Sequence, residues 1–375
     1  MAVAELRETI EWLACDLLSG DVITYLHGVR GDISRALGAY ESSTLEIPTP
    51  LSGQLANRLV TGQVGPPNTV IVADVNSVPA WSGIVWATEE SSAGGLTVAT
   101  ATPESFLDSV YTRDMKFTQT EQTSIMRDLA QRAVNNGLPL KFDITETGVV
   151  RDREYHDDED ATVYQRMQEL SDVVGGPEWT IDTIWGDEHK RKIVFVLRVR
   201  PTIGAGLARP KGPISTHGPA RATWKLSHEW GKGRGANAII ATASGEGDAR
   251  PQSPELTDIR PGYPKIEYRW SPSSSIKEVS TLIEHASAKL DEISDGTRLL
   301  EIEARWDQPP VRLGVDLMLG DWIEYELYGP SRPTGMRGYK RMIGWKLGSS
   351  GRFTPYLLGN EEKTNEIIST LASEE

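Results

Sequence analysis

Four consecutive acidic residues, Asp157, Asp158, Glu159 and Asp160, are the side chains in this sequence whose types and spacing best suggest chemistry. Paired carboxylates can perform general acid–base catalysis. The residues that follow have a helical pattern, however, with one apolar face made of Val163, Met167, Leu170 and Val174. Carboxylates beside the first turn of a helix interact with the positive end of its macrodipole. We therefore expect this run to stabilise a helix, and a hydrolase that uses these carboxylates is the alternative.

The other chemically versatile residues form no recognisable set. The six histidines are scattered and no pair has helical ligand spacing; they are His27, His156, His189, His217, His228 and His285. Cys15 cannot form an internal disulfide or a zinc site alone, and its apolar neighbours indicate a buried small hydrophobe. The glycines of residues 231–235 lack the full phosphate-binding pattern, so we expect a hairpin tip there. The sequence therefore predicts no catalytic, metal or cofactor-binding residues, and no cofactor.

Composition limits the classes of protein that the chain can belong to. With 375 residues, 35 Gly and 22 Pro between many short apolar runs, the sequence predicts about two to four β-rich domains. A formal net charge of −14 disfavours gripping nucleic acid, and it would suit a surface past which nucleic acid slides. No apolar stretch approaches the roughly 20 residues of a membrane span. Glu5 and Glu8 argue against a signal peptide, so we expect synthesis in a cytoplasm and no membrane span.

The pattern of the first hundred residues predicts an antiparallel barrel or sandwich. Two strands, at residues 10–17 and 22–26, are predicted to form a hairpin, and a helix over 5–17 is the alternative to the first of them. Further strands are predicted at 44–47, 70–74, 82–86 and 96–100. Residues 31–38 are expected to form a compact turn or a single helical turn, and a turn carrying Pro79 and Trp81 is expected between two of the strands.

Residues 102–200 have the pattern of an α+β unit. Thr102 and Pro103 predict one helix start, and the capping box from Thr118 to Glu121 predicts another, with that helix ending near residue 137. The helix after the acidic run ends at Gly175-Gly176-Pro177, and strands at 179–185 and 193–199 form a hairpin.

The remaining chain is expected to be mainly strand. A linker covers residues 201–219, followed by strands at 224–228 and 236–243. A capping box at residues 275–278 begins a helix that ends near residue 295, and strands follow at 298–305, 322–328, 339–345 and 353–358.

The predicted fold class is a β-rich α+β fold with two β-barrel domains. Residues 1–101 begin the first barrel, 102–200 form the inserted α+β domain, 201–245 complete the first barrel, 246–358 form the second barrel with one long helix, and 359–375 form a tail.

Three passages resemble the tail-tip hub or minor tail proteins of long-tailed, siphovirus-type bacteriophages, especially those of actinobacteria. They are the opening hairpin with residues 31–48; Trp81 to Trp86 together with Gly175 to Trp179; and Leu319 to Tyr325 followed by Arg341 to Trp345. The resemblance implies a likeness to the baseplate hub of contractile-tailed phages, in which two tube-forming barrels per chain assemble as a homotrimer into a pseudo-sixfold ring.

The implied function is structural and not enzymatic: a connector in the virion that joins the tail tube to the tip and lets the genome through. The implied partners are a distal tail or tail-tube protein, the tape-measure protein and other tail-tip or receptor-binding proteins, with DNA passing unbound. Synthesis in the host bacterial cytoplasm and a place at the virion tail tip are expected. A tail protein that itself binds a host-surface glycan, and a cell-wall hydrolase, are the alternatives.

Overall fold

A computed structural model describes residues 10–48, 65–92, 95–173, 175–204, 212–231, 233–243, 250–272 and 279–358. The chain divides into two compact units. The main unit contains Met1–Thr223 and Glu303–Leu358, and the small unit contains Trp224–Ile302 and Gly359–Glu375. The predicted tail at 359–375 lies outside the described residues, and so does the capping box at 275–278.

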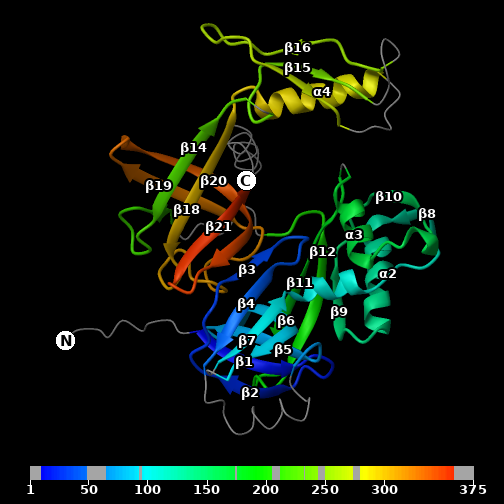
Figure 1. Ribbon diagram of the computed structural model, residues 1–375, viewed down its shortest axis with the longest axis vertical. Helices are drawn as coiled ribbons and strands as arrows, with labels where there is room; N and C mark the ends of the chain where they lie inside the picture. The colour runs from blue at the N-terminus through cyan, green and yellow to red at the C-terminus, as the bar shows by residue number, and fades with distance from the viewer. Residues whose placement is uncertain are drawn as a thin grey trace. The chain divides into compact units, whose positions relative to one another are not determined.

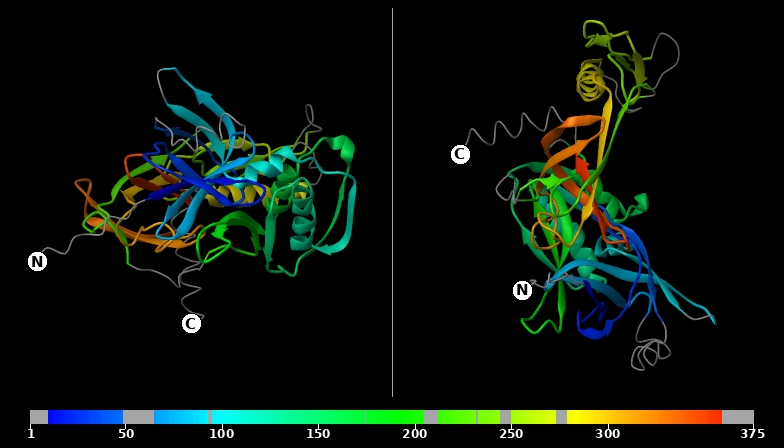
Figure 2. Two further views of the ribbon diagram at one scale, coloured as in Figure 1. Left: turned by 90° about the horizontal axis from the view of Figure 1, so that it is seen from below. Right: turned by 90° about the vertical axis from the view of Figure 1, so that its left-hand side faces the viewer.

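The main unit begins with a six-stranded antiparallel sheet in the order β2-β1-β5-β6-β7-β4 (Figure 1). Its strands are β1 (Ile10–Asp16), β2 (Val22–Leu26), β4 (Ser42–Ile47), β5 (Thr69–Val75), β6 (Val78–Glu90) and β7 (Leu96–Ala101). β5 is buried along its whole length and is apolar from Val70 to Ala73, whereas β4 alternates exposed and buried residues. The predicted strands are confirmed, and the sheet is curled, with the β6–β7 hairpin extending beyond it (Figure 2).

The turn between β5 and β6 differs from the prediction. Asn76 and Ser77 have φ of 51° and 70°, the conformation of a two-residue hairpin turn. Pro79 and Trp81, which we expected in the turn, lie in β6. Trp81 is 1% exposed, so the sheet is stabilised by burying this side chain.

The next segment adds two further sheets and two α-helices. Its elements are η1 (Pro103–Ser109), β8 (Met115–Glu121), α2 (Gln122–Asn135), β9 (Leu140–Ile144), β10 (Val150–Tyr155), η2 (Asp157–Glu159), α3 (Val163–Ser171), β11 (Glu178–Trp185) and β12 (Ile193–Arg200). β8 pairs with β10, and β12 lies between β11 and β9. One apolar core joins this segment to the first sheet, and it includes Leu13, Val72, Ile84, Leu129 and Phe195.

The capping box predicted from Thr118 to Glu121 is wrong. These residues belong to β8, which pairs with β10 in antiparallel register. Glu121 is itself the N-cap of α2, because its carboxylate accepts hydrogen bonds from the backbone N–H groups of Thr123 and Ser124. The strand pairing outweighs the local capping signal, and the helix starts at Gln122.

The C-terminal part of the main unit belongs to a seven-stranded sheet in the order β13-β19-β20-β21-β18-β14, in which β3 also pairs with β20. These strands are β13 (Ile214–Ser215), β14 (Thr223–Glu229), β18 (Thr297–Arg305), β19 (Trp322–Gly329), β20 (Arg332–Leu347), β21 (Arg352–Leu358) and β3 (Ile33–Ala36). Within residues 201–245, β13 and β14 pair in this sheet, and the expected domain boundaries stay a prediction. The compact turn expected at residues 31–38 is wrong, because β3 pairs with β20. Both pairings join segments far apart in the chain, which local patterns do not reveal.

Besides most of β14 and β18, the small unit contains a three-stranded sheet and one helix. β15 (Ala238–Ala241) lies between β16 (Leu256–Thr257) and β17 (Glu267–Trp270). The described part of the predicted helix is α4 (Val279–Ile293), whose buried face packs on the sheet through Leu282, Ala286 and Leu290. The glycines of residues 231–235 were expected at a hairpin tip, but they connect strands of two different sheets. The whole chain has a β-rich α+β fold, as predicted.

Candidate functional site

The acidic run forms a short turn on the surface of the main unit. Asp157 accepts two hydrogen bonds of 2.8 Å from Arg113, and Glu159 forms an ion pair with Arg166. The run does not cap α3, because Thr162 is the N-cap and forms a reciprocal capping box with Gln165. The run therefore gives α3 no side-chain cap, and its predicted interaction with the macrodipole stays a prediction. Asp157 and Glu159 pair with nearby arginines.

The described residues contain no group of three or more His, Cys, Asp or Glu side chains that could hold a metal ion. In the same ranges, no helix is long and apolar enough to cross a membrane. Cys15 is buried, and burial, followed by the charges of Asp16 and Asp21, raises the pKa of its thiol to about 12. The thiol is therefore protonated at neutral pH, which agrees with its predicted role as a small hydrophobe.

A well-connected polar site lies where three of the sheets of the main unit meet, and β3 is at its centre. β3 pairs with β20, with Ala36 opposite Gly344 and Ile33 opposite Leu347. The indole Nε1 of Trp81, from β6, donates a 3.0 Å hydrogen bond to the carbonyl of Ser34. Four residues along the chain, the N–H of Gly38 donates to the carbonyl of Trp179 in β11 at 2.8 Å. One short segment therefore forms hydrogen bonds to three different sheets.

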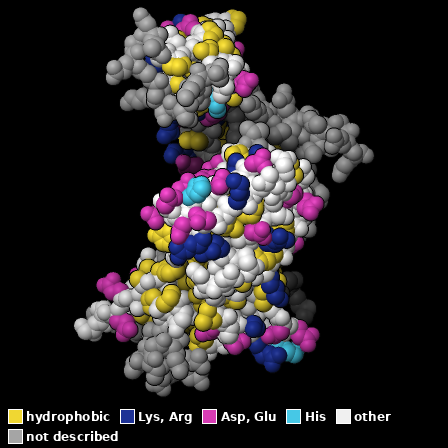
Figure 3. Space-filling model, turned by 90° about the vertical axis from the view of Figure 1, so that its right-hand side faces the viewer, with side chains coloured by type: hydrophobic (Ala, Val, Ile, Leu, Met, Phe, Trp, Pro, Cys, Tyr) yellow, Lys and Arg dark blue, Asp and Glu magenta, His cyan; other side chains and the backbone are white. Residues whose placement is uncertain are grey.

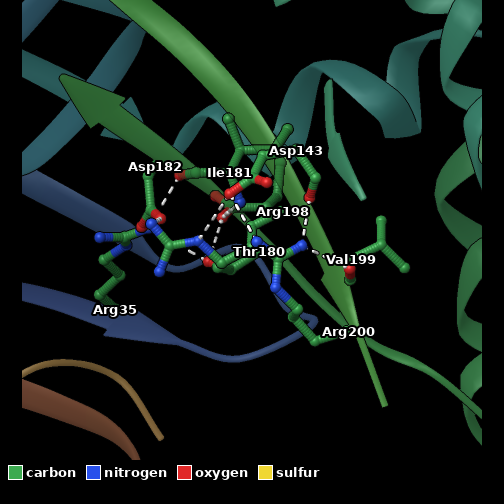
Figure 4. Close-up of polar contacts among 9 residues, drawn as sticks. Arg35, Asp143, Thr180, Ile181, Asp182, Arg198, Val199 and Arg200 are labelled. Carbon is green, nitrogen blue, oxygen red and sulfur yellow. Dashed lines mark hydrogen bonds and ion pairs between the residues drawn. The ribbon is translucent and has the colours of Figure 1, made fainter. Parts of the chain in front are cut away.

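Arg35 extends from β3 onto the edge of β11 (Figure 4). Its Nη2 lies 2.6 Å from Oδ1 of Asp182 and donates to the carbonyl of Ile181 at 2.9 Å. The other carboxylate oxygen of Asp182 lies 2.7 Å from Arg198 on β12. Asp143 of β9 continues the row by pairing with Arg200 at 2.7 Å. Arginines and aspartates thus alternate across four strands.

Glu104 lies beneath this row and is fully buried. Its Oε1 accepts a hydrogen bond of 2.9 Å from the N–H of Ile181, while its Oε2 has no hydrogen-bond partner among the described residues. Burial raises the pKa of this carboxyl group, and the charge of Arg35 partly offsets the increase. A neutral carboxyl is favoured in such surroundings.

A second ion pair joins β11 to β20. Arg341 donates to both carboxylate oxygens of Glu178, at 2.6 and 2.5 Å, and to the carbonyl of Ile203 at 2.7 Å. Arg341 is 8% exposed. The backbones of residues 203–204 and Gly320 touch here, and a Cβ on Gly320, whose φ is +88°, would collide with the carbonyl of Ile203. Only a glycine fits this crossing without strain.

We call Arg35, Glu104, Glu178, Asp182 and Arg341 the junction. Its side chains hold one another and the backbone, an arrangement that fixes the sheets relative to one another within the main unit. Sequence reasoning did not identify these residues as a site. A signal was present for two of them, since Glu178 and Arg341 belong to two passages of the resemblance, which the structure brings together. Arg35, Glu104 and Asp182 carried no such signal, because their partners are distant in the chain.

Comparison with known proteins identifies the fold. Neither a protein-family model nor a curated protein matches the sequence. Among solved structures, the 43 kDa tail protein of prophage MuSo2 from Shewanella oneidensis matches with a TM-score of 0.60 at 10% identity, over 94% of this chain and 99% of that one. A tail protein from Neisseria meningitidis MC58 matches with a TM-score of 0.54 at 13% identity, over 92% and 96%.

A third match comes from a larger chain. A chain of the Francisella PdpA–VgrG complex matches with a TM-score of 0.52 at 9% identity. The match covers 99% of this chain but 52% of that one. The chain therefore shares its fold with the MuSo2 and Neisseria tail proteins over more than nine-tenths of its length.

Proposed function

We propose that this chain is a structural protein of a bacteriophage tail tip, and that it forms a trimeric ring of pseudo-sixfold symmetry. The observation that carries the proposal is the fold shared with the MuSo2 tail protein over 94% of this chain and 99% of that one. A likeness that spans both chains nearly completely favours a common architectural role over the sharing of one module.

The described strands support an assembly that closes on itself. β2 and β4 are the edges of the six-stranded sheet in the described part of the chain. Single backbone bridges, such as that between Arg30 and Glu46 of β4, cover these edges only in part. Unpaired strand edges invite pairing with another chain, and closure into a ring removes them. The junction would keep the sheets in the fixed arrangement that such a ring requires. We infer that each chain contributes two tube-like domains, so that three chains match a sixfold tail tube.

The ring would join the tail tube to the tip and let the genome pass. Its partners would be a distal tail or tail-tube protein, the tape-measure protein, and other tail-tip or receptor-binding proteins. The chain would be made in the cytoplasm of a host bacterium, and we propose an actinobacterial host and a siphovirus-type tail. No enzymatic role is proposed, since Asp157 and Glu159 are engaged by arginines.

The charge of the chain suits passage of DNA. Acidic residues number 53 against 39 basic ones. Acidic and basic side chains are interspersed over the face shown in Figure 3. Cationic walls would hold a polyanion by counterion release, so we propose that the lumen is neutral or acidic. DNA would then pass without specific binding.

Light scattering on the purified chain tests the oligomeric proposal. We expect a mass three times the chain mass of 41.3 kDa, with little monomer across a concentration series. The measurement is repeated after adding the distal tail protein, because closure can require a template. A monomer at every concentration, with and without that protein, would contradict the ring.

A further inference from the structure

A cavity of about 130 Å³ lies inside the main unit, between the start of β1 and the turn that joins β20 to β21. The link between β2 and β3 and the loop after β18 complete its walls. The apolar part of the lining consists of Ile10, Trp12, Val29, Ile33, Trp306 and Leu347. Apolar cavities of roughly this volume can hold benzene. The cavity is therefore large enough for one aromatic ring.

Two tryptophans bring hydrogen-bond donors to this cavity. Trp12 and Trp306 are each 9% exposed, and neither indole N–H has an acceptor among the described residues. A Cβ placed on Gly351, which also lines the cavity, would lie 3.5 Å from Nε1 of Trp306. The N–H edge of Trp306 is therefore at the cavity wall. The indole N–H of a buried tryptophan usually has a hydrogen-bond partner, so a ligand with an acceptor would complete this site.

Arg30 is the single charged residue of the lining. Its side chain is exposed and makes no ion pair or hydrogen bond within the described part of the chain. Glu46 lies opposite Arg30 in a backbone bridge, but the two side chains form no ion pair and Glu46 does not line the cavity. Asp32 is already engaged, since it accepts the N–H of Ser349 at 2.9 Å and pairs with Lys346 at 2.8 Å. The lining therefore offers an unpaired positive charge and no carboxylate.

The polar groups of the lining select the chemistry of a ligand. A guanidinium and an indole are donors only, and the guanidinium alone has five N–H groups. A hydrogen bond in which both partners are charged is shorter and roughly twice as strong as one between neutral groups. An aromatic ring placed beside an indole gains more than its buried area alone provides. An aromatic ring that carries one carboxylate meets all three conditions.

We propose that this cavity binds a small aromatic carboxylate. The ring would lie among the apolar walls beside Trp12 and Trp306. The carboxylate would accept hydrogen bonds from the guanidinium of Arg30 and from the indole N–H of Trp306. This inference goes beyond the proposed function and does not depend on it, because every residue involved belongs to the main unit of one chain.

NMR of the indole N–H groups in the ¹⁵N-labelled full-length protein tests the proposal. Benzoate, benzamide and acetate are the probes: benzamide lacks the charge, and acetate lacks the ring. The Trp306 signal, identified by its loss in Trp306→Phe, reports on the cavity. The Trp81 signal is the control, because this residue is 1% exposed and its N–H donates to the carbonyl of Ser34 at 3.0 Å. We expect benzoate to shift the Trp306 signal saturably, with half-saturation at a concentration roughly tenfold lower than either other probe needs. Benzamide or acetate acting at the same concentration as benzoate, or no saturable shift with benzoate, would overturn the proposal.

Two variants locate the group that binds the carboxylate. Arg30→Gln is expected to remove the preference for benzoate over benzamide, while an unchanged Trp81 signal shows that the variant is folded. Arg332→Gln is the matched control, because Arg332 is also exposed and also makes no ion pair among the described residues. This control should keep the preference. If Arg30→Gln keeps it as well, the carboxylate binds elsewhere and the proposal is wrong. If Arg30→Gln does not fold, the three titrations of the wild type still decide the outcome.

Discussion

Replacing Glu178 by Gln perturbs the junction with the smallest change in shape. The variant leaves Arg341, which is 8% exposed, without its bidentate carboxylate. The guanidinium keeps the backbone carbonyls of Ile203 and Gly320, at 2.7 and 3.2 Å. Removing one partner of a buried ion pair costs about 3–5 kcal/mol. Because Glu178 is 29% exposed and Gln retains an acceptor, we expect the free energy of unfolding to fall by about 2–3 kcal/mol.

Urea unfolding followed by tryptophan fluorescence measures this change, since Trp179 and Trp345 are buried on the strands that the ion pair joins. Protein concentration is held fixed because assembly stabilises the folded chain. Asp157→Asn is the matched control: its carboxylate also accepts two hydrogen bonds from one arginine but is 46% exposed. The control should cost about 0.2–1 kcal/mol. If Glu178→Gln lowers the free energy of unfolding by no more than Asp157→Asn does, our account of the junction is refuted.

Further changes test individual positions. Gly320→Ala should lower the free energy of unfolding in urea by at least about 1–3 kcal/mol, because φ is +88° and the new Cβ would collide with the carbonyl of Ile203. Gly348→Ala is the control. Its Cβ would meet nothing nearer than 3.6 Å, so the free energy of unfolding should change by less than about 0.5 kcal/mol. Replacing all four acidic residues at 157–160 by Asn or Gln should leave peptidoglycan turnover unchanged. If the wild type cleaves peptidoglycan and the folded variant does not, these carboxylates are catalytic and our structural interpretation of them is wrong. Burial raises the pKa of Glu121, but hydrogen bonds to its carboxylate outweigh burial and lower it overall. The ionised Glu121 carboxylate thus stabilises the fold fully above the ordinary carboxyl pKa, and this contribution is lost as pH falls through the lowered pKa. The urea midpoints of the wild type and of Glu121→Gln should therefore converge in acid. A constant difference would contradict this assignment.

Features with a local pattern could be predicted from the sequence. The strands at residues 44–47 and 70–74 were predicted correctly; the second contains the apolar run Val70 to Ala73, because burial on both faces of a strand leaves such a run in the sequence. The described part of α4 and the strands at its C-terminal side were also predicted. These elements were enough to give the β-rich α+β class.

Features made by distant pairing could not be predicted. β3 has four residues, and its partner β20 lies some three hundred positions later, so nothing local separates it from a turn. The junction depends on the same kind of contact, since Arg35 meets Asp182 and Glu178 meets Arg341. The true N-cap, Glu121, was included in the predicted motif, but the pairing of β8 moved the start of the helix. The domain boundaries remain predictions.

A cryo-electron microscopy reconstruction of the assembled tail tip tests the central proposal most directly. The account predicts three copies of this chain in a closed ring between the tail tube and the tip, with lumen-facing side chains that are neutral or acidic. Single copies that decorate the outside of the tail, or a lumen lined mainly by Lys and Arg, would contradict it.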